Sequence, residues 1–277
     1  MRGSFPRARL IMTDLSAFPI TRKWPARHPE RLQLYSLPTP NGVKVSIMLE
    51  EIGLAYEPHK VSFDNDDQLS PEFISLSANN KIPAILDPNG PGGQPLPLFE
   101  SGAILQYLAE KSGQLLSQDP AQRYQTLQWL MFQMGGIGPM FGQVGFFHFF
   151  AGKEYEDKRP RDRYVNESKR LLGVLDRHLK GREWMVDEYS IADIAIFPWV
   201  RNLVERLQRP RPGWLRSVQG RAASAGGVPR AAGRATGPEN PRLIRQHRPY
   251  VHAPAIVGAA LCRERAARRP RDFSTDA

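Results

Sequence analysis

The sequence contains one cysteine, Cys262, among its 277 residues. A single thiol excludes an internal disulfide and fits a reducing compartment, so we expect a cytoplasmic protein. No apolar run is long enough to cross a bilayer, and the first residues lack the apolar segment and cleavage site of a signal peptide. His148 has no metal-ligand partner at a suitable spacing in the sequence, so we assign no metal.

Lysine is absent after Lys180, and the composition changes near the C-terminus. The formal net charge is +10, yet residues 1–203 hold 23 basic and 23 acidic residues, whereas residues 204–277 hold 15 arginines and 5 acidic residues. The last part is rich in Arg, Ala, Pro and Gly and cannot bury enough apolar surface to offset its ordering entropy. We therefore predict a disordered tail over 204–277, or the product of a frameshift near codon 204, because GC-rich DNA read in a shifted frame yields this composition.

The arginine-rich tail has a competing interpretation, an arm that binds nucleic acid. It contains few aromatic residues, and its arginines do not fall on one helical face. Nucleic-acid binding is therefore a minor alternative.

Residues 32–113 alternate short apolar segments with helical patterns in the order βαβαββα, which resembles a thioredoxin-like domain. Residues 119–203 contain helical patterns only. They begin at the capping sequence Asp119-Pro120, and their first helix meets several glycines after Met134, where we expect a kink. Residues 1–31 carry four prolines without sustained periodicity and are predicted to be an irregular extension. The fold class is thus an α/β thioredoxin-like domain followed by an all-α domain, which lacks an apolar helix after residue 203.

The stretch from Asn80 to Ile104 carries the strongest functional signal. Ile82-Pro83 enters a short apolar strand, and because proline lacks an N–H, the backbone groups of Ile82 are expected to stay free for a ligand. A second strand ends at Glu100-Ser101, where a helix begins, and we expect Ser101 to be its N-cap. A helix N-terminus favours a carboxylate, and the Glu100 side chain favours an ammonium. Together they suit the headgroup of an α-amino acid.

Two sequence segments, Lys81-Ile82-Pro83-Ala84 and Phe99-Glu100-Ser101-Gly102-Ala103-Ile104, resemble the glutathione site of cytosolic glutathione S-transferases. The resemblance implies a cis proline, pairing of the Ile82 backbone with the cysteinyl part of glutathione, and binding of the γ-glutamyl end by Glu100 and Ser101. It also implies a homodimer. The turn Thr39-Pro40-Asn41-Gly42 resembles the bacterial nu-like group, some of whose members reduce small disulfides with glutathione.

Such an enzyme has to stabilise the glutathione thiolate, since a free thiol ionises only near pH 8.5. A donor aimed at the sulfur lowers that pKa, and the family places this donor in the turn after the first strand. Tyr35, Ser36, Thr39 and Asn41 lie there. Tyr35 is expected to pack within the strand and Ser36 to end it, so we predict Thr39 and Asn41 as the catalytic residues. Asn41-Gly42 can also simply cap the following helix.

Four further residues are predicted to bind glutathione: Gln68, Asn80, Lys81 and, from the helical domain, Arg163. Gln68 and Asn80 can equally cap loops, and Arg163 can be an exposed arginine on a helix face. Residues 135–150, rich in glycine and phenylalanine, can line a pocket for an apolar second substrate or form core.

Residues 1–203 contain no cysteine, so a mechanism with a protein thiolate is excluded for this part. The predicted function is a glutathione-dependent enzyme that transfers glutathione to an electrophile or reduces a disulfide. The alternatives are a glutathione-dependent isomerase and a non-catalytic, transferase-like binding protein.

Overall fold

The computed structural model describes residues 15–207. Its single sheet has the strand order β2-β1-β3-β4. β1 runs parallel to β2, whereas β3 is antiparallel to both β1 and β4. The strands are β1 (Leu32–Ser36), β2 (Tyr56–Lys60), β3 (Ala84–Asp87) and β4 (Leu96–Phe99). This arrangement confirms the predicted thioredoxin-like domain.

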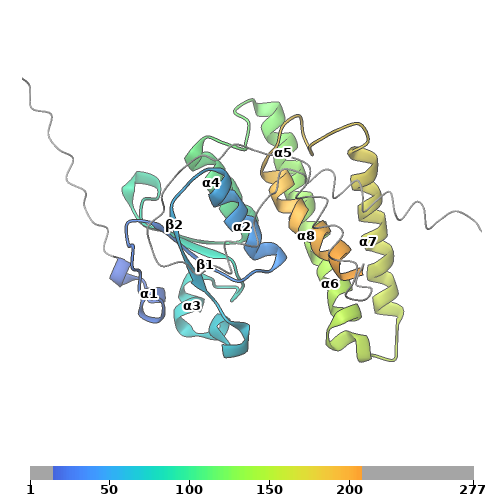
Figure 1. Ribbon diagram of the computed structural model, residues 1–277, viewed down its shortest axis with the longest axis horizontal. Helices are drawn as coiled ribbons and strands as arrows, with labels where there is room; N and C mark the ends of the chain where they lie inside the picture. Colours follow the sequence, from blue (N-terminus) through green and yellow to red (C-terminus); the bar gives the residue numbers. More distant parts are fainter. Residues whose placement is uncertain (1–14, 208–277) are drawn as a thin grey trace, which may run out of the picture. The chain divides into compact units, whose positions relative to one another are not determined.

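Helices cover both faces of the sheet (Figure 1). One face carries α2 (Pro40–Glu51) and α4 (Ser101–Ser112), and the other carries α3 (Pro71–Leu76). Because successive strand side chains point to opposite faces, Leu34 and Ile85 lie on one side and Tyr35 on the other. All three side chains are buried, so the sheet is the centre of this domain's core.

The residues before β1 are folded onto the sheet. They contain a 3₁₀ turn, η1 (Leu15–Ala17), and a short helix, α1 (Ile20–Lys23). Leu15 and Ile20 are buried in the cluster that also holds Tyr35 and Phe73. The sequence predicted an irregular extension over residues 1–31, and residues 24–31 contain no helix or strand. Residues 15–23 differ, because proline is compatible with a helix start, as Pro19 before α1 shows. Residues 1–14 lie outside the described range.

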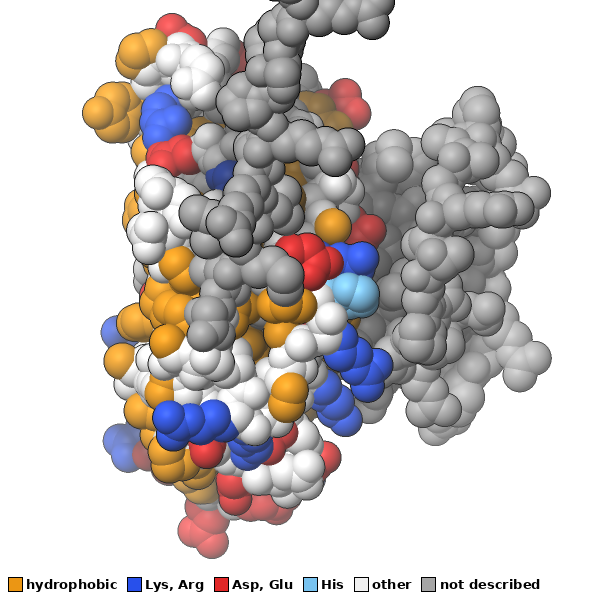
Figure 2. Space-filling view, turned by 90° about the vertical axis from the view of Figure 1, so that its left-hand side faces the viewer, with side chains coloured by type: hydrophobic (Ala, Val, Ile, Leu, Met, Phe, Trp, Pro, Cys, Tyr) orange, Lys and Arg blue, Asp and Glu red, His pale blue; other side chains and the backbone are white. Residues whose placement is uncertain are grey.

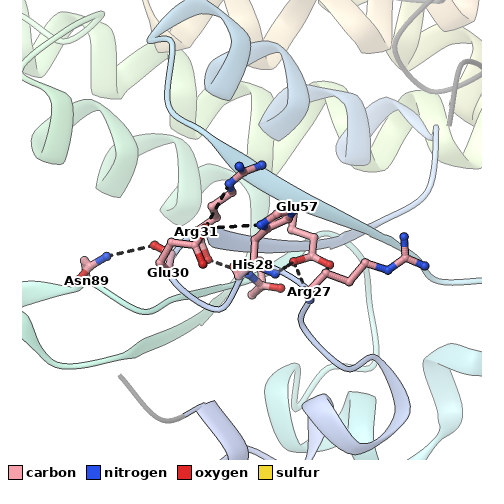
Figure 3. A network of polar contacts seen from close by, with 7 residues as sticks. Arg27, His28, Glu30, Arg31, Glu57 and Asn89 are labelled. Atoms are coloured by element: carbon pink, nitrogen blue, oxygen red, sulfur yellow. Dashed lines mark hydrogen bonds and ion pairs between the residues drawn. The ribbon is translucent and has the colours of Figure 1, made fainter. Parts of the chain in front are cut away.

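This N-terminal segment is anchored to β2, an edge strand, by hydrogen bonds (Figure 3). The Glu57 carboxylate accepts from the backbone N–H of Arg27 at 3.0 and 3.1 Å and from that of His28 at 2.7 Å. The Trp24 indole N–H donates to the Lys60 carbonyl at 3.1 Å. The strand is thereby held from the side on which it has no neighbouring strand.

The helical domain begins as predicted. The Asp119 side chain accepts from the Gln122 N–H at 2.9 Å and so caps α5. At the predicted kink, α5 widens into a π-helical turn, η5, and then continues as α6. The elements are α5 (Pro120–Phe132), η5 (Gln133–Ile137), α6 (Gly138–Phe149), η6 (Ala151–Glu154), α7 (Arg159–His178) and α8 (Ile191–Leu207).

The tail predicted to begin at residue 204 lies outside the described range apart from the last turn of α8, and so does Cys262. Between residues 15 and 207, no helix combines the length and apolarity needed to cross a membrane. Lys and Arg side chains are interspersed with Asp and Glu on the face shown in Figure 2. This fits the balanced charge of residues 1–203.

Candidate active site

The loop before β3 contains one residue, Ile82, whose backbone groups have no backbone partner in the described part of the chain. The Ile82–Pro83 peptide bond is cis, as the family resemblance implied. The loop is fixed by two hydrogen bonds, from the Asn80 N–H to the Ser77 carbonyl at 2.8 Å and from the Ser77 hydroxyl to the Lys81 carbonyl at 2.9 Å. Within residues 15–207, neither the N–H nor the C=O of Ile82 pairs with another backbone group. These groups are therefore available to an extended ligand, as the sequence predicted.

The register of β3 and β4 brings the two halves of the motif together. Ala84 pairs with Phe99, so Pro83, before one, and Glu100, after the other, lie at the same end of the two strands. Glu100 is exposed and has a φ of 72°, which is rare for a residue with a side chain. Such backbone strain is concentrated at functional sites.

The predicted N-cap role of Ser101 is wrong. Ser101 is the first residue within α4, and the N-cap position belongs to Glu100, which makes no capping side-chain bond. The Ser101 side chain is buried, and its hydroxyl accepts a hydrogen bond from the Lys44 ammonium at 3.2 Å. The Ser101 hydroxyl therefore bonds to Lys44, 57 residues earlier in the sequence, and not to a backbone N–H of the α4 N-terminus.

The cap of α2 is Thr39. Its hydroxyl oxygen accepts from the Gly42 N–H at 3.2 Å, which leaves the hydroxyl proton available to an acceptor. The following glycine is required, because a Cβ at Gly42 would lie 2.0 Å from the Leu37 carbonyl oxygen. Thr39 is thus the N-cap of α2, and the alternative in which Asn41-Gly42 caps this helix is wrong.

Asn41 uses its side chain across the domain boundary. Its amide oxygen accepts from the Trp199 indole N–H at 2.9 Å. Because an indole N–H can only donate, this contact assigns the oxygen to Trp199 and leaves the amide NH₂ for another partner. Thr39 and Asn41 thus both retain donors at the start of α2.

The two neighbouring candidates in this turn are unsuitable donors. Tyr35 is completely buried, and its hydroxyl has no hydrogen-bond partner in the described part of the chain. Burial, assisted by the Glu57 charge, raises the pKa of the Tyr35 phenol. The Ser36 hydroxyl is directed to the Leu37 carbonyl at 3.5 Å. Both placements agree with the packing and strand-end roles that the sequence suggested.

Lys44 is the residue of this region that the sequence analysis missed. Its ammonium is completely buried, 3.2 Å from Ser101 Oγ, 2.6 Å from Gln133 Oε1 and 3.6 Å from Met134 Sδ. Burial lowers the pKa of Lys44 to about 7, although the Glu100 carboxylate acts in the opposite direction. Helical spacing was the available signal, since Lys44 falls three residues after Asn41 and four before the buried Met48.

Two predicted glutathione ligands, Gln68 and Arg163, form no hydrogen bond or ion pair with the other candidate residues among residues 15–207. Gln68 lies in the turn η3 (Asp67–Leu69); its Oε1 is buried without a hydrogen-bond partner among residues 15–207. Arg163 is exposed on α7, and in the same range no hydrogen bond or ion pair joins it to another candidate. Their roles remain predictions.

The aromatic residues of α6 divide between core and surface. Phe141 is buried, and Phe147 stacks on Tyr164 with ring centroids 5.6 Å apart. Phe146, and Phe150 directly after α6, are exposed at 36% and 52%, so part of the aromatic run stays open to solvent. Around His148, as elsewhere in residues 15–207, no three His, Cys, Asp or Glu side chains are grouped as metal ligands.

Comparison with known proteins agrees with this geometry. The chain is 44% identical over 200 residues to the disulfide-bond oxidoreductase YfcG of Escherichia coli, an alignment that covers 70% of this chain and 92% of that protein. The chain belongs to the glutathione S-transferase family. Residues 30–110 match the N-terminal domain of glutathione S-transferases, which confirms the resemblance found in the sequence.

Solved glutathione transferases share the fold. A glutathione transferase from Pseudomonas putida, with one glutathione disulfide bound per subunit, is 90% identical, with a TM-score of 0.70 over 76% of this chain and 89% of that one. A glutathione transferase from Burkholderia graminis, with two glutathione molecules bound per subunit, is 75% identical, with a TM-score of 0.70 over 76% and 86% of the two chains.

Proposed function

We propose that the protein is a glutathione-dependent enzyme that reduces small disulfides. The observation that carries this proposal is the convergence of three elements: the cis Ile82–Pro83 loop, the strained Glu100 at the start of α4, and the donor-bearing first turn of α2. The hydrogen bond between Ser101 and Lys44, which follows the first turn of α2, joins α2 to the start of α4.

Glutathione lies along these elements. The exposed Glu100 carboxylate receives the γ-glutamyl ammonium, and Ser101 with the α4 N-terminus receives the α-carboxylate. The free backbone groups of Ile82 pair with the cysteinyl residue. Asn80 and Lys81 directly precede Ile82, and Oε1 of Gln68, buried without a partner among residues 15–207, is a further acceptor.

The thiolate is stabilised at the start of α2. The Thr39 hydroxyl and the Asn41 amide each keep a donor, and a donor that bonds the charged sulfur lowers the thiol pKa. The N-terminus of α2 adds its partial positive charge. These groups hold the nucleophile ionised at neutral pH.

Both sulfur nucleophiles come from glutathione, because residues 1–203 contain no cysteine. The first thiolate attacks one sulfur of the substrate R–S–S–R, releases RS⁻, which takes up a proton, and leaves a mixed disulfide. A second glutathione thiolate attacks the glutathione sulfur of that mixed disulfide and releases the second RS⁻ with glutathione disulfide. The bound glutathione disulfide and the paired glutathiones of the relatives support a site for two such molecules.

Conjugation is the competing activity, since exposed aromatic side chains on α6 suit an apolar electrophile. We expect faster glutathione-dependent reduction of hydroxyethyl disulfide than conjugation of a halonitrobenzene. The opposite preference would reassign the enzyme to conjugation. Retention on glutathione-agarose without either activity would make it a binding protein.

The proposed enzyme is a cytoplasmic homodimer, as the family resemblance implies. On α5, Tyr124 and Met131 are exposed at 72% and 57%, which gives this helix apolar surface for a second subunit. Light scattering coupled to size-exclusion chromatography tests the subunit number, and a monomer at micromolar concentration would contradict it.

A further inference from the structure

A buried ammonium lies directly beneath the proposed γ-glutamyl site. Lys44 is completely buried, and its Nζ contacts the Ser101 hydroxyl on α4 together with Gln133 and Met134 of η5. Gln133 Oε1, at 2.6 Å, is a neutral acceptor and Met134 Sδ a weak one. Buried charges are normally paired with an opposite charge, and no carboxylate of residues 15–207 is in hydrogen-bond contact with this ammonium, so it calls for an anion from outside that range.

The bond to Ser101 dictates how that hydroxyl can act. An ammonium only donates, so the Ser101 oxygen must accept at 3.2 Å and its own proton must point elsewhere. The acceptor within reach is Met134 Sδ at 3.7 Å, a weak one. A carboxylate arriving at the start of α4 would offer this proton a much stronger, charged acceptor.

We propose that Lys44 is a positioning residue for glutathione. It donates to the Ser101 oxygen, so that the Ser101 hydroxyl proton points at the α-carboxylate of the γ-glutamyl group. It also supplies a positive counter-charge for that carboxylate. The inference rests on the proposed function. It adds a residue, Lys44, and a division of labour in which Ser101 touches the carboxylate and Lys44 acts through Ser101.

The surroundings of Lys44 fit a charge that awaits its counter-ion. The groups packed on Nζ are neutral, and the carboxylate that acts on it is Glu100, which is exposed and is assigned to the ligand ammonium. With burial pulling the pKa of Lys44 down to about 7, the unliganded lysine is close to losing its proton at neutral pH. A bound carboxylate favours the charged form and draws the proton back.

Two glycines keep the partners of Lys44 in place. A Cβ at Gly102 would lie 3.0 Å from Met134 Cγ and 3.1 Å from its sulfur. A Cβ at Gly138 would lie 2.8 Å from Gln133 Nε2. The side chains of η5 therefore reach Lys44 through space that only glycine leaves open, and the π-helical turn is part of the same arrangement.

The test is a thermodynamic cycle between one side chain and one ligand group. The ligands are S-methylglutathione and the same compound with 4-aminobutyryl in place of γ-glutamyl, which lacks only the α-carboxylate. We expect Lys44→Met to weaken S-methylglutathione binding roughly 10- to 100-fold, as for the loss of a charge-assisted contact. We expect it to change binding of the decarboxylated ligand by less than about threefold.

Lys111→Met is the matched control. Lys111 also forms a polar contact in the same domain, with the buried Asp87 at 2.6 Å, but it is partly exposed and lies at the opposite end of β3 from Pro83. Its replacement should leave the affinity for both ligands unchanged. Equal losses for the two ligands in Lys44→Met would show a merely structural role, and no loss for either would also overturn the inference.

A second measurement needs no variant. By calorimetry in two buffers of different ionisation enthalpy at about pH 8, wild-type protein should take up more protons with S-methylglutathione than with the decarboxylated ligand, since Lys44 is largely neutral there before binding. Equal uptake would overturn the inference even if Lys44→Met does not fold. Wild-type protein that binds neither ligand would instead overturn the proposed function, and the inference with it.

Discussion

The indole N–H of Trp199 donates to the side-chain oxygen of Asn41 at 2.9 Å, across 158 positions of sequence. This one bond decides which end of the amide faces the start of α2. The α-helical domain thereby orients a residue of the thioredoxin-like domain. Without this bond the amide can rotate, and in the proposed site it would then present its oxygen to the glutathione sulfur.

Trp199→Phe should therefore raise the thiol pKa of bound glutathione by up to about one unit, since a hydrogen bond to a charged acceptor is worth about 1.5 kcal/mol. Thiolate absorbance of bound glutathione, followed against pH, measures this directly. Trp184→Phe serves as the control, because Trp184 packs on Tyr189 instead. An unchanged titration in Trp199→Phe would show that Asn41 is not the donor.

Thr39→Ala should lose both functions of the hydroxyl. Removal of the α2 cap should lower the free energy of unfolding by about 1 kcal/mol. The same change should lower turnover more than glutathione affinity, because a donor to the thiolate is gone. Thr39→Ser keeps the hydroxyl and should retain most of both properties. Denaturant unfolding of the two variants measures the contribution of the cap, and steady-state kinetics measures the contribution of the donor to the thiolate.

The buried Lys44 should make stability depend on pH. Its pKa falls from 10.5 in the unfolded chain to about 7 in the folded protein. Between these values the unfolded state binds more protons, so this group makes the protein more stable as the pH rises through that window. The stability of wild-type protein relative to Lys44→Met should thus increase as the pH rises from about 7 towards 10.5. Parallel stability profiles from denaturant titrations would contradict this assignment.

Asp193→Ala should be among the most destabilising substitutions in the helical domain. The carboxylate accepts from the backbone N–H of Met185 at 2.9 Å and of Ser190 at 3.0 Å, all within the interior. Leaving two buried donors without an acceptor should cost about 3 kcal/mol of unfolding free energy. Asp187→Ala, at an exposed position of the same loop, should change it by less than about 0.5 kcal/mol. Similar unfolding midpoints for the two variants would show that the two hydrogen bonds accepted by Asp193 do not stabilise the fold.

For the arginine-rich tail we retain the proposal of a frameshift near codon 204. Resequencing the gene, or translating the neighbouring frames, should reveal an amphipathic helix after Asn202. A reading in which neither neighbouring frame encodes one would leave the basic arm as the correct interpretation.

Local sequence was sufficient for the order of strands and helices along residues 32–113 and for the Asp119 cap, because each depends on residues adjacent in the chain. The cis Ile82–Pro83 bond was expected from the family resemblance and not from local sequence. Local sequence was insufficient for the hydrogen bond of Ser101, whose hydroxyl accepts from Lys44 and not from a neighbouring backbone N–H. The burial of a lysine depends on acceptors from α4 and η5, and periodicity alone does not show which acceptors will be there.

The N-terminal segment was missed for a related reason. Its apolar residues are too few and too scattered among prolines to produce a periodic signal. Leu15 and Ile20 are buried only because they pack against the folded domain, next to Tyr35 and Phe73.

Because Glu57 anchors the segment before β1, the folded domain begins before residue 32, where the sequence analysis placed its start. A shortened chain that begins at Leu32 would retain every predicted glutathione ligand, yet it would expose the apolar cluster around Tyr35 and Phe73 and release the free edge of β2. Uncovered edges and apolar surfaces recruit other chains, so such a protein should aggregate during expression rather than merely unfold at a lower temperature. In recombinant work, residues 15–31 therefore belong to the domain and decide whether it is recovered in solution.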